Sequence, residues 1–155
     1  MESVVNEIDQ KKLTLKRSLI SVSDKSGLGP LVKMMAEKGI ELIASGGTAQ
    51  YIRSLGLKVT PLQEITGNPE AFDGRMKSLS FQISSSLLYR RNDPKDVAKA
   101  KELGIRPIDC VICNLYPFEE ASKESDLSNL IENIDIGGPT MIRAAAKNYE
   151  HVLVC

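Results

Sequence analysis

The sequence predicts an α/β domain with a mainly parallel sheet flanked by helices on both faces. Short β-branched runs alternate with stretches of helical periodicity, and the connections between them are short. Glycines end several of the expected helices, and polar, glycine-bearing segments follow the expected strands. Because sheets of this kind bind ligands beyond the carboxyl ends of their strands, these polar segments are the candidate site.

The expected elements follow one another in a regular order. The strands are expected at 19–22, 40–44, 57–62, 107–113 and 151–155, and the helices at 27–38, 49–55, 94–103, 127–132 and after the glycine pair at 137–138. Residues 63–80 are rich in loop signals, and "FQISSSLL" (81–88) has enough β-propensity to extend as a strand. In the last helix, we expect Met141, Ile142, Ala145 and Tyr149 to pack inward and Thr140, Arg143, Ala144 and Lys147 to occupy the neighbouring face.

Composition restricts the classes of function. The 155 residues suit one domain, and 20 Lys+Arg balance 20 Asp+Glu, so neither nucleic acid nor a membrane surface is indicated as a partner. No apolar run approaches the roughly 20 residues of a membrane span. We expect residues 1–14 to form a polar N-terminal extension without a secretory signal and 15–155 to form the domain.

The three cysteines indicate a reducing, cytoplasmic setting rather than a metal site. Cys110 and Cys113 have the spacing of a metal-binding pair, but they fall in an expected strand, where residues three apart point to opposite faces. The sequence has no second cysteine pair and one histidine, so no metal site is predicted.

The segment "ASGGTA" is the first candidate for ligand binding. Ser45, Gly46, Gly47 and Thr48 offer consecutive backbone N–H groups ahead of a helix, and these groups together with the helix dipole favour a phosphate. The segment lacks the Walker lysine pattern and the G-x-G-x-x-G spacing. An ordinary strand-to-helix turn capped by Thr48 remains the alternative.

Other strand ends carry further polar side chains. "SVSDKSG" places Ser23, Asp24 and Lys25 after the first strand, and "NLYPF" places Asn114 and Tyr116 after the strand at Cys110. The loop "GRMKS" holds Arg75 and Lys77, which suit phosphate or carbonyl recognition but could equally be solvated. Arg143 and Lys147, four residues apart on the last helix, share one face, so an anionic ligand in front of them is one explanation and surface exposure the other.

Taken together, these motifs resemble a known family. "SVSDKSG", "ASGGTA", "TGNPEAFDGRMKSL", "CNLYPFE", "IENIDIGGPTMIRAAAKN" and "VLVC" are similar, in order, to the N-terminal IMP cyclohydrolase half of the bifunctional AICAR transformylase/IMP cyclohydrolases. The resemblance implies a methylglyoxal-synthase-like fold. It also implies closure of the formylated aminoimidazole carboxamide ribotide, FAICAR, to IMP with loss of water and without a cofactor.

The resemblance also implies roles for individual residues. Lys147 would be the proton donor and acceptor, assisted by Lys77, Tyr116 and Asp135. The nucleotide would be bound by Ser23, Asp24, Lys25, Ser45, Gly46, Gly47, Thr48, Arg75, Ser78, Cys113, Asn114, Ile136, Gly137 and Gly138. The implied partner is a purine ribonucleotide monophosphate, and a homodimer is left open.

Two departures from the family stand out. Where the family reads "GRVKTLHPKIHGGLL", this chain reads "GRMKSLSFQISSSLL", so two histidines, a proline and two glycines are replaced. We therefore expect a loosened catalytic end and reduced turnover. The folate-dependent transformylase half is not in these 155 residues, so we expect no transformylase activity from them.

Two other functions remain open at this stage. A phosphate-binding module that keeps the pocket but not the turnover fits the altered segment. A lyase like methylglyoxal synthase also shares the "SGGT" turn, but the missing histidines argue against it.

Overall fold

The computed structural model describes residues 13–116 and 126–155, so most of the expected N-terminal extension lies outside the described residues. Five parallel strands form one sheet in the order β3-β2-β1-β4-β5. They are β1 (Arg17–Ser21), β2 (Glu41–Ala44), β3 (Thr60–Pro61), β4 (Cys110–Cys113) and β5 (Leu153–Val154). The expected α/β class and parallel sheet are confirmed.

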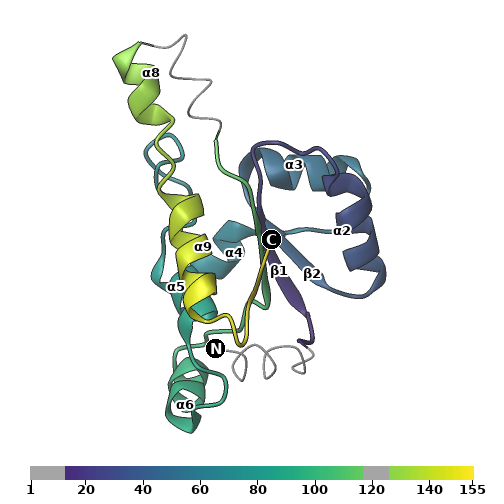
Figure 1. The fold of residues 1–155 in the computed structure, drawn as a ribbon, viewed down its shortest axis with the longest axis vertical. Helices are drawn as coiled ribbons and strands as arrows, with labels where there is room; N and C mark the ends of the chain where they lie inside the picture. Colours follow the sequence, from purple (N-terminus) through teal and green to yellow (C-terminus); the bar gives the residue numbers. More distant parts are fainter. Residues whose placement is uncertain (1–12, 117–125) are drawn as a thin grey trace, which may run out of the picture.

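Helices cover both faces of the sheet (Figure 1). On one face, α2 (Leu28–Glu37) and α3 (Gly46–Ser54) enclose a core that includes Ile20, Val32 and Ile52. On the other face, α4 (Leu62–Thr66), α5 (Phe81–Leu88) and α9 (Gly137–Lys147) enclose a second core. Two further helices, α6 (Pro94–Glu102) and α8 (Leu127–Glu132), lie near the two ends of the view in Figure 1.

The two cysteines of β4 confirm the expected alternation along this strand. Cys110 belongs to the core under α2 and α3, whereas Cys113 packs against the core under α5 and α9. The thiols therefore point to opposite faces of the sheet. Within the described residues, no group of three or more His, Cys, Asp or Glu side chains could hold a metal ion.

The segment 81–88 is helical, so the expected strand there is wrong. Ser80 caps α5 by accepting a hydrogen bond from Ile83 N at 3.1 Å. Ile83 and Leu87, four residues apart, are both buried against α9, and Ser86 Oγ donates to Gln82 O. Packing at helical spacing thus overrides the β-propensity of this segment.

Three smaller expectations also need correction. Residues 62–66 form α4, where the sequence predicted the end of a strand at 62 followed by loop, and α3 begins at Gly46, three residues earlier than predicted. On α9, Ala144 is buried and Tyr149 is 53% exposed, the reverse of the predicted arrangement. Since α9 ends at Lys147, Tyr149 lies beyond the helix and does not continue its apolar face.

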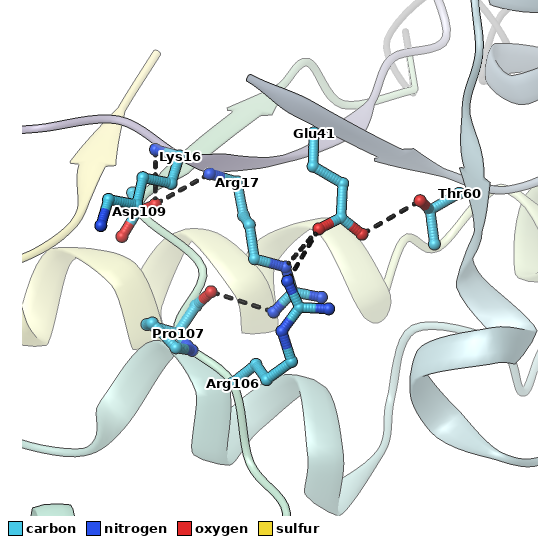
Figure 2. Close-up of polar contacts among 7 residues, drawn as sticks. All are labelled: Lys16, Arg17, Glu41, Thr60, Arg106, Pro107 and Asp109. Carbon is cyan, nitrogen blue, oxygen red and sulfur yellow. Dashed lines mark hydrogen bonds and ion pairs between the residues drawn. The ribbon is translucent and has the colours of Figure 1, made fainter. Parts of the chain in front are cut away.

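A charged network ties together the amino-terminal ends of the strands (Figure 2). Asp109 Oδ2 accepts from the backbone N–H groups of Lys16 and Arg17 at 2.8 Å each. The Arg17 side chain, 5% exposed, donates to Glu41 Oε2 at 2.9 Å, and Thr60 Oγ1 donates to Glu41 Oε1 at 3.0 Å. Burial raises the pKa of Glu41, but Arg17, Thr60 and Arg106 outweigh this and hold the pKa below its usual value.

Candidate active site

The strand order places the topological switch point of the sheet between the carboxyl ends of β1 and β4. The chain leaves β1 towards β2 and β3 on one side and returns to β4 on the other, so β1 and β4 flank the topological switch point. The segments after these two strands contain Ser23, Asp24, Asn114 and Leu115. Ligand sites of open parallel sheets form at this position.

Asn114 joins the two strand ends across this switch point. Its Oδ1 accepts hydrogen bonds from Ser23 N at 2.6 Å and Ser23 Oγ at 3.0 Å, and its Nδ2 donates to Asp24 O at 2.8 Å. Ser23 Oγ is also 3.0 Å from Leu115 O. One amide side chain therefore fixes the backbone of the loop that carries Lys25.

Lys25 lies beside the first turn of α3. Its Nζ donates to Ser23 O at 3.1 Å, and a Cβ built on Gly47 would lie 3.8 Å from the same nitrogen. Ser45 precedes α3 without making a side-chain cap, and Gly46 has a φ of +51°, a conformation that glycine adopts without strain. An ammonium and uncapped backbone N–H groups thus face the same space, which suits an anion.

Thr48 does not cap α3 as the ordinary-turn interpretation required. Its Oγ1 donates to Val22 O at 3.0 Å and accepts from Val22 N at 3.2 Å. This hydroxyl therefore holds α3 against the end of β1, and among the described residues no side chain caps the first turn of α3.

A second group of predicted residues lies at the start of α9. Asp135 Oδ1 accepts from Gly138 N at 2.8 Å, so the carboxylate caps this helix. A Cβ on Gly138 would lie 2.6 Å from Asp135 Oδ2 and 2.7 Å from Leu115 Cδ2, and one on Gly137 would collide with Ser78 Oγ. A side chain at either position would force the side chains of Ser78, Asp135 or Leu115 to move.

Cys113 borders this second group. Burial, with a contribution from the charge of Asp135, raises the pKa of its thiol to about 11. The thiol is therefore protonated at neutral pH and offers a weak hydrogen-bond donor rather than a nucleophile.

The carboxylate of Asp24 accepts hydrogen bonds from Ser26 N and Ser26 Oγ. These bonds favour its charged form and lower the pKa of Asp24.

The structure thus brings most of the predicted binding residues together in one continuous region. Leu115 links the two groups, since Ser23 contacts its carbonyl and Gly138 lies against its side chain. Its contribution was not predicted, because nothing in the sequence distinguishes a leucine whose backbone binds from one that packs.

Other predicted residues lie apart from this region or at its margin. Arg75 forms an ion pair with Glu132 of α8, and Tyr116 and Ile136 are exposed. Lys77 is half-buried. Lys147 lies at the opposite end of α9 from Asp135, about 15 Å along the helix axis at 1.5 Å per residue, so the two charged groups are well separated.

Lys147 instead lines a hollow of about 630 Å³ between α5 and α9. Its other lining residues are Ser84, Leu88, Thr140, Arg143, Ala144 and Ala146. Arg143 and Lys147 form no ion pair with any residue that the structure describes. The expectation that these two cations share a face is confirmed.

Comparison with known proteins places the chain in a class of domains. The family described as the MGS-like domain matches residues 27–140, and the chain belongs to this family. It is 50% identical over 142 residues to the bifunctional purine biosynthesis protein PurH of Ruminiclostridium cellulolyticum, and 52% identical over 141 residues to the PurH of Bacillus cereus (strain ATCC 10987 / NRS 248). Each alignment covers 90% of this chain and 28% of the relative, so the chain spans less than a third of the length of these relatives and matches their N-terminal part.

A solved structure supports the same fold. The crystal structure of ForH superposes with a TM-score of 0.80 at 33% sequence identity, covering 90% of this chain and 72% of that chain. Among residues 13–116 and 126–155, no helix is long and apolar enough to cross a bilayer.

Proposed function

We propose that this chain is an IMP cyclohydrolase that closes FAICAR to IMP with loss of water in de novo purine biosynthesis. The observation that carries the proposal is the polar region at the switch point. Lys25, beside the uncapped start of α3, follows β1, and the turn from Asp135 to Gly138 lies against Leu115, which follows the neighbouring strand β4. The likeness to the N-terminal part of PurH supports it.

In the proposed complex, the two groups bind opposite ends of one nucleotide. The phosphate binds the N–H groups of Gly46–Thr48 and the ammonium of Lys25. The ribose and base extend past Ser23 and Asn114 towards Ser78 and Asp135. Fixing both ends of FAICAR brings its carboxamide nitrogen close to its formyl carbon, and this positioning supplies most of the rate gain.

The reaction itself requires proton transfer and stabilisation of charge on oxygen. The carboxamide nitrogen attacks the formyl carbon and loses a proton, and the formyl oxygen gains one to become a hydroxyl group. This hydroxyl group gains a second proton and leaves as water, while the formamide nitrogen loses its proton and forms the C=N bond of the closed ring. Asp135 Oδ1 is occupied by Gly138 N, so Oδ2 is the oxygen that would accept a hydrogen bond from the carboxamide. Lys77 would stabilise the developing oxyanion, and Tyr116 would assist. The closure transfers no electrons, so the proposal includes no redox cofactor.

Lys147 is proposed as the proton donor and acceptor on the basis of the family resemblance alone. Its position in the hollow between α5 and α9, away from Asp135, favours a second candidate function, a nucleotide-binding module with little or no turnover. The two functions share a ligand, a purine ribonucleotide monophosphate, and a cytoplasmic setting.

Two measurements separate these functions. Calorimetric titration with IMP should give saturable, salt-sensitive binding, which weakens at least tenfold in Lys25→Ala but not in Lys33→Ala, an exposed lysine on α2. An absorbance assay of FAICAR closure then distinguishes the enzyme from the binding module. Absence of IMP binding at millimolar concentration by the folded protein would reject both.

A further inference from the structure

The hairpin turn that carries Arg75 is held in an unusual conformation. Ala71 and Met76 pair through backbone hydrogen bonds of 3.0 and 3.1 Å. Between them, Phe72 and Asp73 have φ values of 56° and 52°, and Gly74 has a φ of 90°. Two consecutive non-glycine residues in the left-handed region are costly, so contacts elsewhere must stabilise this turn.

The ion pair between Arg75 and Glu132 is one such contact. The Arg75 Nε donates to Glu132 Oε2 at 3.1 Å, and its Nη2 donates to Oε1, so the pair is bidentate. The residues are 57 positions apart, and the pair connects the turn to the last residue of α8. None of the side chains of α8 is buried.

Both partners are close in sequence to residues of the candidate site. Arg75 is followed two residues later by Lys77 and then by the buried Ser78, whose hydroxyl lies against Gly137. Glu132 is three residues before Asp135. The ion pair therefore joins the segment that supplies Ser78 to the segment that supplies Asp135.

The geometry leaves part of the guanidinium available. Glu132 uses the edge formed by Nε and Nη2, so the Nη1–Nη2 edge can still donate two parallel hydrogen bonds to an oxygen-bearing ligand. A carboxylate on one edge fixes the plane of the guanidinium and reduces the rotamer freedom lost when a ligand binds the other edge.

We propose that Glu132 is a positioning residue that orients Arg75 towards the nucleotide. The inference rests on the proposed function, because it requires a nucleotide site at the strand ends. Both side chains are more than half exposed, so the pair adds little to stability. Its loss should instead weaken ligand binding by about 2- to 10-fold, the cost of ordering one more flexible side chain.

A double-mutant cycle tests this. We expect Glu132→Ala to raise the IMP Kd and the FAICAR KM by that factor while kcat stays within about twofold, and Glu132→Gln, which keeps the shape without the charge, to be intermediate. In the Arg75→Ala background, Glu132→Ala should have no further effect. Glu102→Ala is the matched control, because Glu102 is an exposed glutamate paired with Lys99 on α6.

The possible outcomes are distinct. If the parent binds IMP and Glu132→Ala binds it equally well, the positioning role is rejected and the proposed function stands. If the effects of Glu132→Ala and Arg75→Ala simply add, Glu132 acts independently of Arg75 and the inference is also rejected. If the folded parent binds no IMP, the proposed function and the inference fail together.

Discussion

Ser84 of α5 and Lys147 of α9 line the same hollow. Ser84 stands where the family motif has its second histidine, so the structure places this departure beside the lysine that the resemblance implies as catalytic. A hydroxyl cannot exchange protons near neutral pH as an imidazole can.

We therefore predict that Ser84→His raises the rate of FAICAR closure, by about tenfold or more if the imidazole takes part in proton transfer. The half-buried Ser85 does not line the hollow, so Ser85→His is the control. The absorbance assay gives the rates. Equal rates for the parent and Ser84→His would show that this departure is irrelevant to turnover.

Lys147→Ala should lower turnover by about 10²-fold or more, the usual scale for a positioned acid–base group, with little change in IMP affinity. Lys101→Ala, at the exposed end of α6, is the control. Steady-state kinetics and calorimetry measure the two quantities separately. A variant that cyclises FAICAR at the parent rate would make Lys147 a surface cation and favour the binding module.

Gly47→Ala should separate stability from binding. The added Cβ would lie 3.8 Å from Lys25 Nζ, an ordinary contact, and alanine favours a helix over glycine by up to about 1 kcal/mol. We expect an unchanged or higher melting temperature but at least tenfold weaker IMP binding, because the methyl group occupies the space beside the ammonium. Gln50→Ala, exposed on the same helix, is the control. Unchanged IMP binding would show that the phosphate does not bind at the start of α3.

Glu41→Gln should destabilise the fold and alter its response to acid. At pH 7 we expect a loss of about 2 kcal/mol, because Arg17 stays buried with a neutral partner. Since the pKa of Glu41 is lowered in the folded state, its carboxylate stabilises the fold above its ordinary value of 4.5, and this stabilisation is lost as the pH falls below it. Urea unfolding should therefore show the difference between parent and variant shrinking from pH 7 to pH 4.

Glu102→Gln provides the comparison for that experiment, since Glu102 is 65% exposed and its pair with Lys99 contributes little. A pH-independent difference between the parent and Glu41→Gln would mean that shape, not charge, determines the role of Glu41.

The sheet was predictable because each strand is a short apolar run with clear ends. The runs around Leu19, Ile43 and Val111 are buried on both faces, which is the pattern of central parallel strands. The helix from Phe81 to Leu88 was not predictable in the same way, because its serines obscure the helical spacing of Ile83 and Leu87. Its N-terminal cap, Ser80, was assigned to a loop. Tertiary packing against α9 decides its conformation.

The candidate site was predictable where it depends on strand order and not where it depends on side-chain direction. Parallel topology brings the segments after β1, β2 and β4 to one edge, so Lys25, Gly47 and Asn114 were expected together. The pairing of Arg75 with Glu132 depends on a turn and a helix 57 residues apart, which no local pattern encodes.

The network of Arg17, Glu41 and Asp109 lies at the opposite end of the strands from the candidate site, roughly 15 Å away for strands of four or five residues. The interactions that stabilise the sheet therefore lie at the amino-terminal ends of the strands, and the candidate site lies at their carboxyl ends. Substitutions at the carboxyl ends of the strands can change the residues of the candidate site without removing the interactions that hold the strands in register. Helix α5 and its cap show the same separation of roles. Six of the seven positions from Ser80 to Ser86 differ from the family motif, while Ile83 and Leu87 still pack in the core. Residues of the site can therefore change during evolution while the fold is retained.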